Sequence, residues 1–461
     1  MKADKPGKVT PVTRRRFLTT AAAGGSLSLV GGGNTLWAAD GPAMSAGEAL
    51  ASAESRRDEL VDLLSQMIRV RSQTGETAEA AQQVVAGYLS GLPYQVEQTA
   101  DRPSAFEAHS EYTPPSPPGD GPFVNVVGRP NSGNGKRIAL FAHIDSHIVE
   151  DGWSTEPYQP VIKDGRLYGL GSADDKGGVA AMLVAASILA KQEGPAPIVI
   201  SHHGKGGGSR GSLPIFERFR ASKEPIDAVL YAHPAETGKG LADIKHVVRG
   251  VLDLQLSVTG WRGAPLEIGL PDSALWSESG DALTACWSAI ESLKADVLSD
   301  VNVNVGVLDA GDRQGSVPDS AVASIRIIFS EQHNWEDLLA ATRSSLEEFF
   351  AGSDSDSQRF QMALEVGQRT NAGAVPWDAE TSIVLRGAIE SVTGDAPKSY
   401  PNHFAGDIRF PLRLLDAPAF GIGSLAGNFY GPDEWVDIDD LVRLVAVLVT
   451  AVAGWANLSD G

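Results

Sequence analysis

Residues 141–178 read FAHIDSHIVEDGWSTEPYQPVIKDGRLYGLGSADDKGG. The apolar run at residues 136–143 ends in His143, and Asp145 follows it. A short run of this kind is typical of a buried parallel strand, and α/β sheets carry functional groups at the carboxyl ends of such strands. Asp174 comes later in the stretch, at a glycine-rich turn. We therefore expect these three side chains to belong to one functional site.

The residues that follow alternate between helix and strand patterns. Residues 178–192 are rich in alanine, leucine and valine and predict a helix. Two further apolar runs, PIVISHH at 197–203 and AVLYAH at 228–233, predict buried strands that end in histidines. This alternation indicates an α/β sheet with a site along one edge.

The pattern changes near residue 250. Residues 251–260 alternate apolar and polar side chains with period two, which suits a sheet with one solvated face. Periodicity then predicts helix 281–295, strands 301–308 and 321–329, helix 335–350 and strand 358–366. The order βαββαβ describes a small inserted α+β domain. The chain then returns with helix 379–392, strand 418–422 and helix 439–455.

The amino terminus has the features of an export signal. Three arginines at 14–16 precede a small apolar run at 19–30, and LWAA at 36–39 offers a small-residue cleavage site. This arrangement is typical of a twin-arginine signal peptide. The apolar run is about a dozen residues long, too short for a membrane span. We expect removal of residues 1–39 and a periplasmic or secreted mature protein, whose first helices lie at 46–70 and 78–92.

The net charge of the chain argues against two classes of binding partner. Removal of residues 1–39 takes away six basic residues and one acidic residue, so the formal charge changes from −20 to −25. A chain this acidic is a poor ligand for nucleic acid or an anionic membrane. The lone Cys286 excludes an internal disulfide and is expected to pack in the interior.

The ordered motifs resemble those of the zinc exopeptidase and deacylase family that includes aminoacylase, succinyl-diaminopimelate desuccinylase and glutamate carboxypeptidase. The matching segments are His143–Asp145, Trp153, Pro157, and residues 164–178, 208–212, 301–321, 406–410 and 430–435. The resemblance implies an α/β fold: a phosphorylase/hydrolase-like catalytic domain with a central mixed sheet, and an inserted ferredoxin-like α+β lid or dimerisation domain. It also implies a homodimer formed through that inserted domain. The corresponding boundaries are 1–39 for the signal, 40–249 and 369–461 for the catalytic domain, and 250–368 for the insertion.

The same resemblance implies a two-zinc site in which ligands of the second ion have been replaced. In the family Asp174 would bridge two zinc ions, and His143 with His233 would complete the first. Asp145 would orient His143 through its other ring nitrogen. The second ion would be doubtful, because its acid pair aligns to Lys205 and Gly206 and its late histidine to Tyr430, although Glu434 is retained. We therefore expect one zinc ion.

The position of the family's general base is also altered. It is occupied by Lys205, which can act as a base, a nucleophile or an anchor for an oxyanion. His202 and His203 are alternative bases or ligands, and adjacent residues of a strand point to opposite faces, so one of the two at most should face the site. His403 is a further candidate ligand. The candidate catalytic residues are thus Asp145, Lys205 and His203.

The export signal and the family resemblance together lead us to expect an exported metal-dependent hydrolase that acts on an amide or related C–N bond in a small amino-acid-like or peptide-like molecule. The alternative is a family member that is catalytically inactive or non-hydrolytic and binds a small molecule or a partner. The exchange of the acid pair for Lys205 and Gly206 motivates this alternative.

Overall fold

The computed structural model describes residues 44–458 except 74, 115–118, 120, 132–134, 192–194, 205–207, 261–280, 313–315, 352–359, 402 and 405. The predicted signal peptide, Lys205 and Gly206 therefore lie outside the described residues. Within the described part, no helix is both long and apolar enough to cross a membrane.

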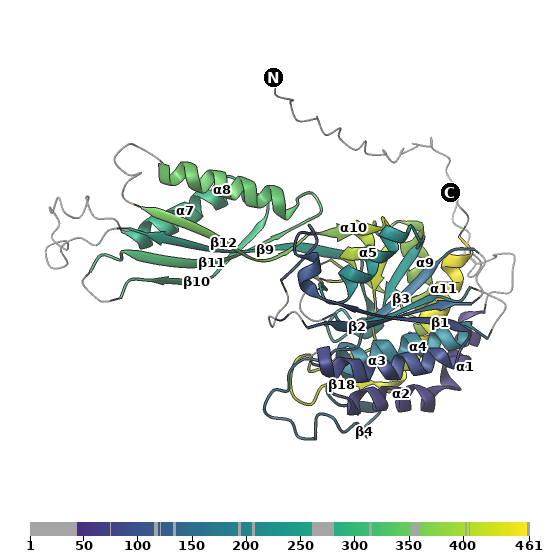
Figure 1. Ribbon diagram of the computed structural model, residues 1–461. Helices are drawn as coiled ribbons and strands as arrows, with labels where there is room; N and C mark the ends of the chain where they lie inside the picture. The colour runs from purple at the N-terminus through teal and green to yellow at the C-terminus, as the bar shows by residue number, and fades with distance from the viewer. Residues whose placement is uncertain are drawn as a thin grey trace, which may run out of the picture. The chain divides into compact units, whose positions relative to one another are not determined.

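An eight-stranded mixed sheet forms the centre of the catalytic part, in the order β1-β2-β6-β3-β7-β16-β8-β14 (Figure 1). Its strands are β1 (Tyr94–Asp101), β2 (Phe123–Pro130), β3 (Ile138–His143), β6 (Ile198–His202), β7 (Ala228–Tyr231), β8 (Asp243–Lys245), β14 (Lys398–Tyr400) and β16 (Ala419–Gly421). Strands β6, β3, β7 and β16 run parallel to one another. The carboxyl ends of β3, β6 and β7 therefore meet at one edge, as their apolar runs predicted.

Helices cover both faces of this sheet. One face carries α1 (Ala46–Glu54), α2 (Arg57–Arg69), α3 (Gly75–Ser90), α4 (Gly177–Leu189), α9 (Glu380–Thr393) and α11 (Ile438–Ala456). The other carries α5 (Ser212–Ser222) and α10 (Arg409–Leu414). Every residue of α4 is buried, which explains why its sequence is apolar all round.

The predicted helix at 46–70 is in fact two helices, separated at Ser55 and Arg56. Helix α1 packs against α11 with Ala49 and Ala53 buried, whereas α2 packs against α4 through larger apolar side chains. The apolar spacing continues across the break, so periodicity alone did not reveal it.

The inserted α+β domain has the expected order β9, α7, β10, β11, α8, β12. The bounds are β9 (Val247–Thr259), α7 (Ala282–Ala295), β10 (Asn302–Ala310), β11 (Ser320–Phe329), α8 (Trp335–Ala351) and β12 (Gln361–Thr370). The four strands form an antiparallel sheet in the order β10-β11-β9-β12, with α7 and α8 packed on the sheet (Figure 1). Cys286 is buried in α7, as expected. The predicted fold class is confirmed.

Shorter elements complete the chain. They are β4 (Val161–Lys163), β5 (Arg166–Tyr168), β13 (Gly373–Ala374), β15 (His403–Phe404), β17 (Ala426–Gly427) and β18 (Trp435–Asp437), with single turns at Pro103–Phe106, Ser172–Lys176 and Gly240–Ala242. Strands β17, β18, β5 and β4 form a small antiparallel sheet. Strands β13 and β15 pair with the start of β9.

Candidate metal centre

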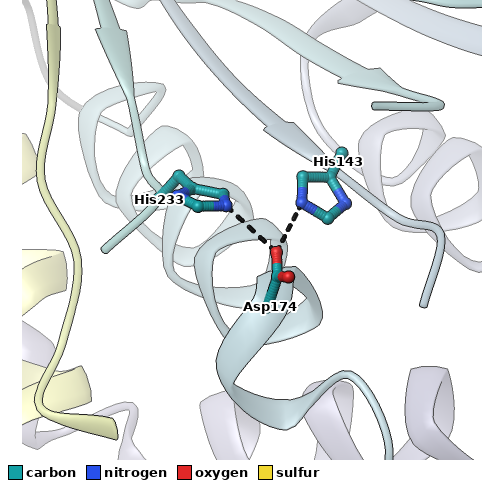
Figure 2. Close-up of side chains that lie close together, drawn as sticks. All are labelled: His143, Asp174 and His233. Carbon is teal, nitrogen blue, oxygen red and sulfur yellow. Dashed lines mark hydrogen bonds and ion pairs between the residues drawn. The ribbon is translucent and has the colours of Figure 1, made fainter. Parts of the chain in front are cut away.

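Three buried side chains converge at the sheet edge. His143 is the last residue of β3, His233 follows β7, and Asp174 lies in the turn before α4. His143 Nε2 is 2.7 Å from Asp174 Oδ1, and His233 Nε2 is 3.0 Å from the same oxygen. Figure 2 shows both imidazole rings directed at this carboxylate. The structure thus brings together the three residues for which a metal role was expected.

Glycine allows this close arrangement. A Cβ at Gly178 would overlap both the carbonyl oxygen of Ala232 and the carboxylate of Asp175. Only glycine therefore lets the start of α4 lie against the chain that leads to His233. The second glycine of the ADDKGG motif therefore has a packing reason.

The cluster fits a zinc ion. One ligand atom from each of His143, Asp174 and His233 lies within 4.8 Å of the others, and no other such group was found among the described residues. His143 Nδ1 donates to the backbone oxygen of Asp145 at 3.1 Å, so Nε2 is the ring nitrogen that faces the cluster. Catalytic zinc sites use this combination of imidazole and carboxylate ligands, with the second ring nitrogen hydrogen-bonded.

Asp145 connects the cluster to His203. Its Oδ1 accepts a hydrogen bond from Gly204 N at 2.8 Å and lies 3.3 Å from His143 Nδ1. Its Oδ2 lies 3.1 Å from His203 Nδ1, a close contact whose angle does not make a hydrogen bond. The fully buried carboxylate thus contacts both rings.

The adjacent histidines His202 and His203 have different surroundings. His202 Nδ1 is 3.2 Å from Ser212 Oγ, which donates to Asp407 Oδ2 at 2.7 Å. Burial lowers the pKa of each imidazole to about 4, so both rings are neutral at pH 7. Neither belongs to the metal cluster, and only His203 contacts Asp145.

Glu434 holds the turn that carries Asp174. Its Oε1 accepts from the backbone N–H groups of Ala173 and Asp174 at 2.8 and 2.9 Å, and its Oε2 from Gly171 N at 2.7 Å. Burial raises the pKa of this carboxyl to about 7. Glu434 therefore positions a cluster residue through its backbone and is not itself in the cluster.

Two of the remaining sequence candidates, Tyr430 and His403, lie near this centre. The Tyr430 hydroxyl donates to Glu236 Oε1 at 3.1 Å, and burial together with the charge of Asp174 raises the pKa of the phenol. The ring of His403 is 6.4 Å from that of His233, measured between centroids, and His403 is outside the three-residue cluster. Lys205 lies outside the described residues.

Two buried lysines beside the centre were not singled out from the sequence. Lys245 Nζ lies 2.6 Å from His233 Nδ1, and burial lowers the pKa of its amine to about 8. Lys176 Nζ donates to the backbone oxygen of Val70 at 3.1 Å, and burial lowers the pKa of its amine to about 7. Lys176 belongs to the ADDKGG motif, so the motif could have identified it as a residue beside the site. Lys245 lies in a short polar segment with no comparable signal.

Comparisons with known proteins agree with this arrangement. A family model described as peptidase family M20/M25/M40 matches residues 139–454, more than half of the chain. A succinyl-diaminopimelate desuccinylase from Rhodospirillum centenum is 28% identical over 333 residues, covering 70% of this chain and 82% of the relative.

Solved structures show the same fold at low identity. Aminopeptidase PepT from Bacillus cereus has a TM-score of 0.65 and 17% identity, covering 87% of this chain and 99% of its own. The YXEP protein of Bacillus subtilis, described as a dinuclear metal binding peptidase, has a TM-score of 0.60 and 12% identity, covering 87% of this chain and 98% of its own.

Proposed function

Because the chain belongs to the M20/M25/M40 peptidase family, a family of metal-dependent hydrolases, we propose that it hydrolyses an amide or related C–N bond with one bound zinc ion. The family resemblance predicted from the sequence is confirmed. The proposed substrate is a small amino-acid-like or peptide-like molecule. The observation that carries the proposal is the convergence of His143 and His233 on the Asp174 carboxylate.

His143, Asp174 and His233 would hold the ion and leave a fourth position for water or substrate. A zinc ion at this place supplies a Lewis acid that polarises a carbonyl oxygen and makes water a stronger acid. The chain itself orients His143 through Asp145. His203 lies against Asp145 and is the candidate to take up a proton, with Lys205 as the alternative; burial lowers the pKa of the His203 imidazole to about 4, which makes it a weaker base at pH 7 than an ordinary histidine.

The number of ions and the activity can be measured together. We expect purified mature protein loaded with zinc to retain about one equivalent, because one three-ligand site is complete in the described residues. We also expect it to cleave members of a panel of N-acyl amino acids and dipeptides. A chelator should abolish cleavage, and added zinc should restore it. Elemental analysis and amine release are the two measurements.

The outcomes separate the alternatives. Less than about half an equivalent after careful loading would contradict the metal site, since a three-ligand site should fill. Two equivalents of zinc would contradict the proposal of a single bound ion. One equivalent with no cleavage of any panel member would favour the inactive or non-hydrolytic alternative.

We also propose that the protein is exported by the twin-arginine route, on the strength of residues 14–39. The double variant Arg14→Lys with Arg15→Lys should remain uncleaved in the cytoplasm of a bacterial host that has this route, whereas the unaltered full chain should appear outside it in a shortened form. Cell fractionation with immunoblotting measures both. Equal export of the double variant would contradict the proposal. The homodimer and the absence of nucleic-acid and membrane partners stay predictions.

A further inference from the structure

Lys245 is a fully buried ammonium group in direct contact with a cluster histidine. It ends the short strand β8, and its Nζ lies 2.6 Å from His233 Nδ1. The other ring nitrogen, Nε2, faces Asp174 Oδ1 at 3.0 Å. The imidazole of His233 therefore lies between a cation on one side and the candidate metal centre on the other.

The hydrogen bond from Lys245 and a metal ion on the other side of the ring require different tautomers of His233. An ammonium group has three donors and no acceptor, so His233 Nδ1 must accept the hydrogen bond from Lys245. A neutral imidazole that accepts at Nδ1 carries its proton on Nε2, where it can donate to Asp174. In this tautomer Nε2 has no lone pair for a metal ion. The backbone oxygen of Pro234, 2.9 Å from Nδ1, favours the opposite tautomer, which can bind a metal ion.

His143 shows the contrast within the same site. Its Nδ1 contacts the backbone oxygen and the carboxylate of Asp145, which are both acceptors. Acceptors behind a ligating histidine fix the tautomer that binds the metal and raise the basicity of the ring. His233 has such an acceptor in Pro234 O, but it also has the ammonium group of Lys245.

The surrounding residues hold Lys245 in this position. A Cβ at Gly421, in the neighbouring strand β16, would overlap the Lys245 side chain. The ammonium nitrogen lies 5.3 Å from the centre of the Tyr231 ring, within the range of a cation–π contact. Glycine on one side and an aromatic ring on the other thus form a slot for this side chain.

We propose that Lys245 is a positioning residue that weakens zinc binding at His233 by donating a hydrogen bond to Nδ1. The inference deepens the proposed function and rests on it for the identity of the ion. Partners behind metal-binding histidines change metal affinity by roughly 10–100-fold. Here the partner is a donor where an acceptor is usual, so its removal strengthens binding.

The test compares Lys245→Met with the unaltered protein. Methionine has a similar length and no hydrogen-bond donor. Among the described residues, Pro234 O is then the one polar contact left at His233 Nδ1. We expect the zinc dissociation constant, measured by competition with a chromophoric chelator, to fall by about tenfold or more. Lys176→Met is the matched control, because Lys176 is equally buried but donates to Val70 O and should give no gain.

A gain in affinity is a result that general damage to the site would not produce. An unchanged or weaker zinc affinity in folded Lys245→Met would overturn the inference, and so would an equal gain in Lys176→Met.

A second measurement does not depend on any variant at position 245. In zinc-free protein labelled with ¹⁵N-histidine, long-range ¹H–¹⁵N spectra should show His233 with its proton on Nε2, and His233→Gln assigns the signal. A proton on Nδ1 would overturn the inference. If no variant binds zinc, the proposed function fails, while a proton on Nδ1 in this spectrum would still overturn the role of Lys245.

Discussion

Asp174→Asn is expected to remove zinc binding and amide hydrolysis together. Both histidines of the cluster direct Nε2 at Asp174 Oδ1, so this oxygen is the common point of the three-residue site. Asparagine keeps the shape of the side chain but loses its negative charge. An apparent binding free energy of roughly 10–16 kcal/mol over three or four ligands corresponds to about 2.5–5 kcal/mol for each. The expected loss of affinity is therefore about 10²–10⁴-fold.

Asp175→Asn is the matched control for this experiment. Asp175 is adjacent and fully buried, and asparagine keeps the shape of its side chain, but Asp175 does not belong to the three-residue cluster. Its Oδ2 accepts from the backbone N–H of His143 at 3.3 Å. Chelator competition should show zinc affinity within about threefold of the unaltered protein, below the change expected from loss of a ligand. Asp174→Asn that still binds zinc tightly would refute the assigned centre.

The parts of the site that the sequence predicted lie on strands buried on both faces. Strands β3 and β6 are buried throughout and β7 likewise, so their sequences are continuous apolar runs with the polar residue at the end. The parallel order then brings those ends together. The strand pattern therefore predicted that His143 and His233 lie at one edge of the sheet, and the family resemblance added Asp174 to them as a metal ligand.

Other elements gave weaker signals for physical reasons. Strand β1 is an edge strand with mostly solvated side chains, and β8 and β14 have three residues each, so no apolar run marks them. Lys245 in the segment DIKH resembles a surface lysine, and it is buried only because Gly421, far away in the sequence, leaves room for it. Contacts of this kind depend on the tertiary fold, and periodicity does not report them.

Glu434→Ala is expected to cost several kcal/mol of unfolding free energy, even in zinc-free protein. The variant leaves the backbone N–H groups of Gly171, Ala173 and Asp174 without the acceptor that they now share. Each buried donor left unpaired costs about 1–3 kcal/mol, and a whole domain has only about 5–15 kcal/mol of stability. Urea unfolding with chelator present measures the loss without any contribution from the metal.

The unfolding free energy of Glu434→Gln should fall between that of the unaltered protein and that of Glu434→Ala. Its amide oxygen can replace Oε1, which accepts from Ala173 and Asp174, but its amide nitrogen would then face the N–H of Gly171, so one donor stays unpaired. Asp433→Asn is the control, because asparagine tolerates the positive φ of 56° at this position and keeps an acceptor for the exposed backbone N–H of Ser154, so stability should change by less than about 1 kcal/mol. Equal losses in Glu434→Gln and Glu434→Ala would show that the charge of Glu434 matters rather than its hydrogen bonds. If the hydrogen bonds dominate, zinc affinity should fall in the same order as stability, because the same three bonds fix the backbone that presents Asp174 to His143 and His233.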